Sequence, residues 1–172
     1  MLAYTMSEKR GDLDLVMFRL AEKLAQEGWR TAGIVQTNTD CGDDRPCDMD
    51  VKVLPDGPVM RISQSLGKDS RGCRLDMNAL ETAVGNVSQI LNAQTDVLLI
   101  NKFGKQEADG RGLRGVIGTA VGLGVPVVCG VNALNREAFL RFSDGCAQQV
   151  ETDVDALYAW FVAQQDQTSQ SA

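Results

Sequence analysis

Hydrophobic and polar positions change their period several times along the chain, and these changes predict alternating strands and helices. Short apolar runs are typical of strands, whereas apolar residues three and four positions apart are typical of helices. We predict strands at residues 2–6, 31–38, 49–54, 58–65, 96–102, 126–131 and 144–150. We predict helices at residues 13–28, 79–91, 112–124, 136–142 and 154–165, followed by a frayed tail at 166–172.

This order of elements indicates a single α/β domain over residues 1–165, built as a three-layer, doubly wound, mostly parallel sheet. The apolar run DVLLINK at 96–102 predicts the central strand, because a strand buried on both faces is apolar throughout. The strands on either side of PDG at 55–57 predict an inserted antiparallel hairpin.

Smaller signals predict helix ends and core positions. Gly28 is expected to end the first helix, and Asp76 to cap the helix at 79–91. Cys129 lies in the apolar run PVVCGV and is expected in the core. The packing side of the last helix is expected to carry Leu157, Trp160 and Phe161, with a subunit interface as the alternative for the two aromatic residues.

Composition narrows the function classes. The chain has 172 residues, a formal net charge of −6 and no histidine. Such a chain lacks the dense Lys and Arg of a general nucleic-acid surface, and without histidine it cannot build a His-based triad or a His-ligated zinc site. No apolar run reaches the length of a membrane span and the N-terminus shows no signal segment, so we expect a cytoplasmic protein without membrane contact.

The loop SEKRGDLD at 7–14 follows the first predicted strand, where a phosphate-binding loop would stand. It has one glycine, Gly11, and it lacks the lysine and hydroxyl that end a phosphate loop. Asp12 or Asp14 is instead expected to cap the following helix. Lys9 and Arg10 could contact an anion from the side.

Two basic loops that contain glycine follow later strands. Ligands of open α/β sheets bind beyond the carboxyl ends of the strands, so an anion site is expected at these loops. The loop at 61–76 supplies the candidate ligand-binding residues Arg61, Ser63, Ser65, Lys68, Arg71 and Arg74. The loop at 101–114 supplies Asn101, Lys102, Gly104, Lys105, Glu107 and Arg111. Solvated loop charges are the alternative for the first loop.

Three cysteines form a third candidate site. Cys41 and Cys47 lie in the acidic segment 39–50 and, together with Cys73, could form a thiolate metal site. Their spacing differs from the C-x2-C of zinc ribbons, and free thiols are the alternative.

Three stretches carry a resemblance to a known family: ISQSLG at 62–67, RGCRLD at 71–76 and LLINKFGKQEADGRGLR at 98–114. Together with the order of elements, they resemble a bacterial domain-of-unknown-function family, number 2478. That family is itself similar to the small P-loop nucleoside triphosphatases of the thermophile type. The resemblance covers nearly the whole chain, and it implies a P-loop-NTPase-like sheet with an anion pocket.

The chain departs from those enzymes at two places. Their central strand ends in an acidic magnesium-binding pair followed by IGKME, a segment with which NKFGKQE aligns. Asn101 and Lys102 therefore occupy the acidic positions, and the phosphate-loop lysine and hydroxyl are missing at 7–14. Hydrolysis by the usual route needs Mg²⁺, that lysine and an oriented water, so the resemblance implies a degenerate member of the group.

The leading hypothesis is a non-hydrolysing binding or accessory protein that holds an oxyanion or a nucleotide phosphate between the two basic loops. Members of the resembling family are associated with molybdenum- or nitrogenase-related loci, which implies molybdate or tungstate as the ligand. One alternative is a nucleotide-hydrolysing or phosphotransfer enzyme that has rebuilt its site with Lys102 and Glu107. Another is a thiolate metal-binding protein. A homo-oligomer or a protein partner stays open.

Overall fold

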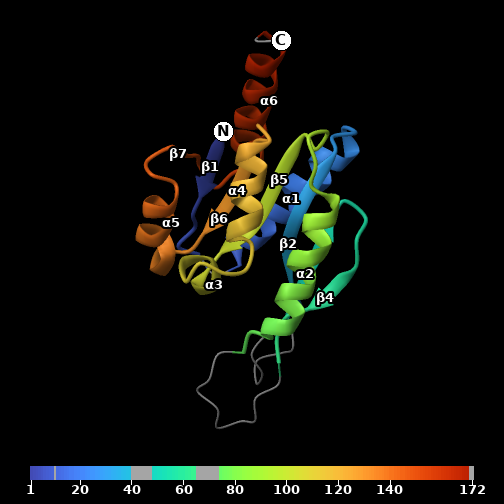
Figure 1. The fold of residues 1–172 in the computed structure, drawn as a ribbon, viewed down its shortest axis with the longest axis vertical. Helices are drawn as coiled ribbons and strands as arrows, with labels where there is room; N and C mark the ends of the chain where they lie inside the picture. The colour runs from blue at the N-terminus through green and yellow to red at the C-terminus, as the bar shows by residue number, and fades with distance from the viewer. Residues whose placement is uncertain (10, 40–47, 65–73, 171–172) are drawn as a thin grey trace.

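The computed structural model describes residues 1–9, 11–39, 48–64 and 74–170. Over these ranges, seven strands form one sheet in the order β4-β3-β2-β5-β6-β1-β7 (Figure 1). The strands are β1 (Leu2–Thr5), β2 (Thr31–Thr39), β3 (Asp48–Leu54), β4 (Val59–Arg61), β5 (Val97–Phe103), β6 (Val127–Val131) and β7 (Ala147–Gln149). The helices are α1 (Asp12–Gln26), α2 (Met77–Ile90), α3 (Lys105–Ala108), α4 (Arg114–Gly122), α5 (Arg136–Phe142) and α6 (Val154–Gln170), with a 3-10 turn η1 (Ala133–Asn135).

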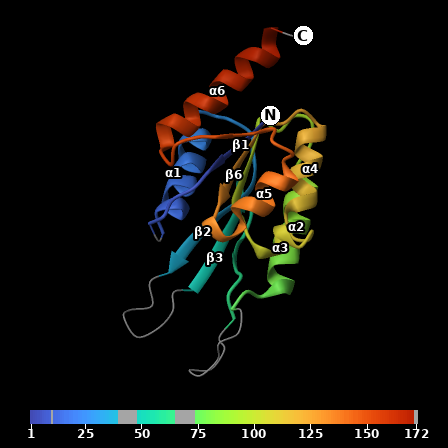
Figure 2. The same ribbon diagram turned by 90° about the vertical axis from the view of Figure 1, so that its left-hand side faces the viewer.

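Helices cover both faces of the sheet and bury one apolar core on each face. Helices α1 and α6 lie on one side, and α2, α4 and α5 lie on the other (Figure 2). The core under α1 and α6 includes Met17, Leu99 and Phe161, and the opposite core includes Leu98, Ile117 and Phe139. This arrangement confirms the predicted three-layer α/β class, in which alternate strand residues face opposite cores.

Strand β5 is central, as its apolar run predicts, and it pairs in parallel with β2 and β6. Its pairing with β2 depends on Gly33, which has φ +117° and lies opposite Leu99. A Cβ atom at this position would stand 1.9 Å from the Leu99 carbonyl oxygen. Glycine therefore permits the close approach of the two backbones.

The segment that follows β2 extends the main sheet. Strand β3 pairs antiparallel with both β2 and β4, so the predicted hairpin is present as the edge of the seven-stranded sheet. Strand β4 ends at Arg61, earlier than the predicted residue 65, because from Ile62 onward the chain also pairs with the segment that leads into α2. A bridge joins Ser63 to Leu75, and the Gln64 N–H donates to the Arg74 carbonyl at 2.7 Å.

Gly28 ends α1 as predicted, with φ +80° just beyond the last helical residue. The beginning of the helix agrees with prediction at α2 and differs at α1. The Asp76 side chain accepts hydrogen bonds from the N–H groups of Asn78 and Ala79, which confirms it as the N-cap of α2. The N-cap of α1 is Gly11, so the prediction that Asp12 or Asp14 is the cap is wrong. Both carboxylates lie in the first turn of α1, where they still interact favourably with the helix dipole.

Other differences come from local backbone geometry. Strand β7 begins at Ala147, later than predicted, because Asp144 and Gly145 adopt positive φ values of 47° and 73° in a turn. The tail predicted to fray from residue 166 is helical through Gln170, and no glycine or proline interrupts residues 154–170. Periodicity did not reveal the short elements α3 and η1, which are only four and three residues long.

The two predictions on core residues are confirmed. Cys129 is fully buried in β6, and the α6 residues Leu157, Trp160 and Phe161 are buried in the core that α6 shares with α1. Within the described ranges, no helix is long and apolar enough to cross a membrane.

Candidate functional site

A cavity of about 650 Å³ opens at the carboxyl edge of the parallel strands. Its walls come from the loops that follow β1, β5 and β6, from β2 and β3, and from the beginning of α2. Parallel strands bring these loops together at one edge of the sheet, which is where ligands of open α/β sheets bind. The cavity is therefore the candidate functional site.

The cavity has a charged part and an apolar part. The charged lining residues are Glu8, Lys9, Asp14, Arg74, Lys102, Lys105 and Glu107. The apolar lining residues are Leu13, Ile34, Met49, Ile62, Leu75, Leu80 and Leu113. Five of the apolar residues form one apolar wall of the cavity. They come from β2, from β3, from the segment after β4 and from the beginning of α2: Ile34, Met49, Ile62, Leu75 and Leu80.

Lys102, at the end of the central strand, forms an ion pair with Asp14 in the first turn of α1. The Lys102 Nζ lies 3.2 Å from the Asp14 Oδ1. The Asp14 side chain is nearly buried, whereas the Lys102 side chain keeps 32% of its surface exposed. The Lys102 side chain is therefore held against the first turn of α1 while part of its surface stays exposed, and the residue lines the cavity.

Glu107 organises the loop at the end of β5. One carboxylate oxygen accepts from the Gly104 N–H at 2.9 Å, and the other accepts from the Leu113 N–H at 3.0 Å. Burial raises the pKa of this carboxyl group above its ordinary value, and the two backbone N–H groups oppose the rise. A Cβ atom at Gly112 would stand 2.3 Å from the Glu107 Oε1, so the loop is wrapped closely around the carboxylate.

Asn101 and Gln106 present polar atoms that have no partner among the described residues. Asn101 is only 1% exposed, and neither its amide nitrogen nor its amide oxygen makes a hydrogen bond. The Oε1 atom of Gln106 is buried and unpartnered as well. Buried polar groups are almost always hydrogen-bonded in native proteins, so two such groups in one cavity call for a functional explanation.

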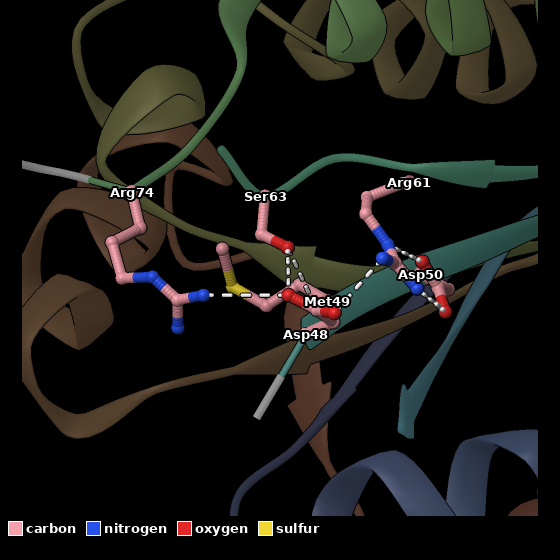
Figure 3. Close-up of polar contacts among 6 residues, drawn as sticks. All are labelled: Asp48, Met49, Asp50, Arg61, Ser63 and Arg74. Carbon is pink, nitrogen blue, oxygen red and sulfur yellow. Dashed lines mark hydrogen bonds and ion pairs between the residues drawn. The ribbon is translucent and has the colours of Figure 1, made fainter. Parts of the chain in front are cut away.

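A second polar cluster links β3 to the residues on either side of the 65–73 segment (Figure 3). Asp48 accepts from the Ser63 hydroxyl at 3.2 Å and forms ion pairs with Arg61 and Arg74 at 2.9 and 3.4 Å. Arg61 also pairs with Asp50 at 3.0 Å. Carboxylates on β3 therefore neutralise cations that the sequence suggested for an oxyanion.

The structure gathers only some of the predicted ligand-binding residues. Six line the cavity: Arg74, Asn101, Lys102, Gly104, Lys105 and Glu107. Arg61 and Ser63 belong to the Asp48 cluster and do not line the cavity, and Arg111 pairs with Asp109 at 3.5 Å instead. Ser65, Lys68 and Arg71 lie outside the described residues.

The predicted thiolate site also lies outside the described residues, because Cys41, Cys47 and Cys73 all fall in the undescribed segments. Among the residues that the structure does describe, no group of three His, Cys, Asp or Glu side chains could hold a metal ion.

Sequence reasoning missed five polar residues of the cavity: Ser7, Glu8, Gln36, Gln106 and Asn132. Asn132 directly follows a predicted strand, so the rule on carboxyl strand ends could have found it. Gln36 is buried in β2 on the same face as Ile34, and a polar residue on an apolar strand face is itself a signal. Lys9, expected to approach an anion from the side, does line the cavity.

The sheet order, the helices on both faces and the cavity at the carboxyl edge together define a P-loop-NTPase-like α/β fold. The crystal structure of THEP1 from the hyperthermophile Aquifex aeolicus has this fold, with a TM-score of 0.55 to the present chain. The similarity covers 89% of this chain and 90% of that one at 17% sequence identity. At this identity the likeness concerns the fold alone.

Within this class, the chain belongs to the family described as "Protein of unknown function (DUF2478)", which matches residues 2–160. It is also similar to the molybdenum import ATP-binding protein ModC 2 of Bradyrhizobium diazoefficiens, with 34% identity over 150 residues. That match covers 87% of this chain but only 17% of the relative. The chain thus spans about a sixth of the length of that relative.

Proposed function

We propose that this protein is a non-hydrolysing accessory protein that binds an oxyanion in the cavity at the carboxyl edge of its sheet. The ion pair between Lys102 and Asp14 carries the proposal. The pattern of the P-loop enzymes places a lysine on the loop after the first strand and acids at the end of the central strand. Here the acid lies at the start of α1 and the lysine on the central strand, so the charges are exchanged.

This exchange disfavours hydrolysis of a nucleoside triphosphate. Mg²⁺ prefers oxygen ligands with carboxylate character, and the end of β5 offers it an amide and an ammonium. Glu107 is the nearest carboxylate along the chain, and both of its oxygens accept hydrogen bonds from backbone N–H groups. A rebuilt enzyme that uses Glu107 as its acid would first have to break those bonds.

The same exchange favours the binding of an anion. Lys9 and the partly exposed Lys102 line the cavity beside the first turn of α1, where backbone N–H groups and the helix dipole attract negative charge. Charge-assisted hydrogen bonds from ammonium groups are among the strong ones. Asp14 competes with the ligand for Lys102, so binding would replace one ionic partner with another.

The similarity to a molybdenum import protein makes molybdate and tungstate the first anions to test. Both are tetrahedral dianions, as sulfate is, and a comparison at equal ionic strength separates a selective site from general charge screening. An accessory role in molybdenum import is the cellular context that this ligand would suit.

A thermal-shift panel tests the proposal with molybdate, tungstate, sulfate, phosphate and ATP with or without Mg²⁺. Bound ligand at about 100 times its Kd stabilises a protein by about 2.7 kcal/mol, which for a domain of this size raises Tm by about 5 °C or more. We expect this rise with molybdate and tungstate and a smaller one with sulfate.

The paired variant Asp14→Asn/Lys102→Met removes both charges together and should abolish the rise. Lys52→Met removes a lysine on β3 that does not line the cavity and should keep the rise. Release of phosphate from ATP in the presence of Mg²⁺ would contradict the non-hydrolysing role, and the absence of a shift with every anion would contradict the binding role.

A further inference from the structure

The cavity is larger and more apolar than a bare oxyanion requires. Its volume of about 650 Å³ lies within the range of pockets that hold drug-sized organic ligands, about 300–1,000 Å³. The side chains of Ile34, Ile62 and Leu80 give it an apolar wall, and these side chains have nothing to offer a hydrated dianion. A tetrahedral oxyanion would occupy only the charged part beside Lys9 and Lys102.

The unpartnered amide of Asn101 indicates which hydrogen-bonding groups a ligand of the cavity would carry. Asn101 lines the cavity, is 1% exposed, and has both a free NH₂ donor and a free C=O acceptor among the described residues. Gln106 lines the same cavity, and its Oε1 atom is buried and has no partner among the described residues. Leaving a buried donor or acceptor unpaired is energetically costly, so a ligand that pairs with these atoms gains specificity.

A bare oxyanion cannot pair with both the donor and the acceptors of these amides. Its oxygens only accept hydrogen bonds, so they could pair with the Asn101 NH₂ group but would face the Asn101 and Gln106 carbonyl oxygens without a donor. The matching partner presents a donor and an acceptor side by side, as a cyclic amide does. A flat ring system that carries such an edge also fits against an apolar wall.

We propose that the cavity binds a planar heterocyclic amide that carries an anionic group, the class to which purine and pterin derivatives belong. The amide edge pairs with Asn101 and Gln106, the ring lies against the wall formed by Ile34, Ile62 and Leu80, and the anionic group faces Lys102. This inference rests on the proposed anion-binding function and names the kind of molecule that carries the anion.

Isothermal titration calorimetry without Mg²⁺ tests the inference with a matched pair of probes. 6-Carboxypterin and 2-naphthoate are both flat, two-ring carboxylates, and only the first has a donor–acceptor edge. We expect 6-carboxypterin to bind the full chain at least about tenfold more tightly, which corresponds to about 1.4 kcal/mol. Molybdate is titrated in parallel as the bare oxyanion.

Two variants test whether Asn101 and Gln106 recognise the donor–acceptor edge of the probe. Asn101→Leu should bring the two aromatic probes to within about twofold of each other by weakening 6-carboxypterin alone. Gln106→Met, at a partly exposed position, should lower the preference about threefold. Gln94→Met changes an exposed glutamine outside the cavity and should leave the preference unchanged.

Equal affinities for the two aromatic probes in the parent chain, or a preference that survives both cavity variants, would overturn the inference. If molybdate binds while 6-carboxypterin shows no advantage, the heterocycle is excluded and the anion-binding function stands. If neither molybdate nor either carboxylate binds, the anion-binding function falls as well.

Discussion

Glu107 and Asn101 lie six residues apart, both line the same cavity and both are almost completely buried, yet their surroundings differ. Glu107 is 3% exposed and each of its oxygens accepts a backbone N–H from its own loop. Asn101 is 1% exposed and its amide has no partner among the described residues. The Glu107 carboxylate thus makes its hydrogen bonds within its own loop, whereas the Asn101 amide is available to a ligand.

The difference teaches how to separate a structural polar group from a functional one. A buried polar group with all its hydrogen bonds made inside the chain holds the backbone in place, and its removal costs stability. A buried polar group without partners costs stability as long as it is present, and a chain gains from it only when a ligand pairs with it. The two residues should therefore respond to substitution with opposite signs.

Replacing Glu107 should have the largest effect. Glu107→Ala leaves two buried N–H groups without acceptors, and we expect the free energy of unfolding to fall by about 3 kcal/mol. Urea unfolding followed by circular dichroism measures the loss. Glu22→Ala, an exposed glutamate on α1, is the control and should change stability by less than about 0.5 kcal/mol. A loss as small as that of the control would show that the loop does not depend on the carboxylate.

Replacing Asn101 should have a smaller effect of the opposite sign. Asn101→Leu keeps the size of the side chain and removes two unpaired polar groups, so we expect the free energy of unfolding to rise by about 1 kcal/mol in the absence of ligand. The same urea titrations measure the gain. A loss of more than about 1 kcal/mol would mean that the amide is paired in solution, and the contrast with Glu107 would then disappear.

The smallest expected effect is a pH dependence. Burial raises the pKa of Glu107 above its ordinary 4.5, so the folded chain holds this proton more tightly than the unfolded chain does. Relative to Glu107→Gln, the parent chain should be most stable below about pH 4.5 and should lose that advantage as the pH rises through the folded pKa.

Asp96 provides the opposite case for this measurement. The hydrogen bond from Arg30 lowers the pKa of Asp96 below its ordinary 3.8, so its contribution is present above that value and is lost as the pH falls. Unfolding free energies of the parent, Glu107→Gln and Asp96→Asn, taken from about pH 3 to about pH 8, should give slopes of opposite sign. A flat difference for Glu107→Gln would contradict the raised pKa.

Much of the fold could be predicted because local patterns and sheet topology agree. The apolar run of β5 predicts its central place, and Asp76 predicts the start of α2. The rule that ligands lie beyond carboxyl strand ends pointed to the loop that begins at Asn101, which does line the cavity. Short elements such as α3, and a helix beginning such as Gly11, were missed because three or four residues carry too little pattern.

By itself, the sequence determined the α/β class, the order of the strands and helices, and the edge of the sheet at which a site must lie. These follow from periodicity and from chain connectivity, which act over short distances along the chain. Only the tertiary structure decided which charges remain available. It paired Lys102 with Asp14, which lies 88 residues away in the sequence, and it paired Arg61 with Asp48. It gave Glu107 backbone N–H donors and left Asn101 without a partner among the described residues. Charge availability and desolvation depend on which distant segments meet, and a linear pattern does not record that.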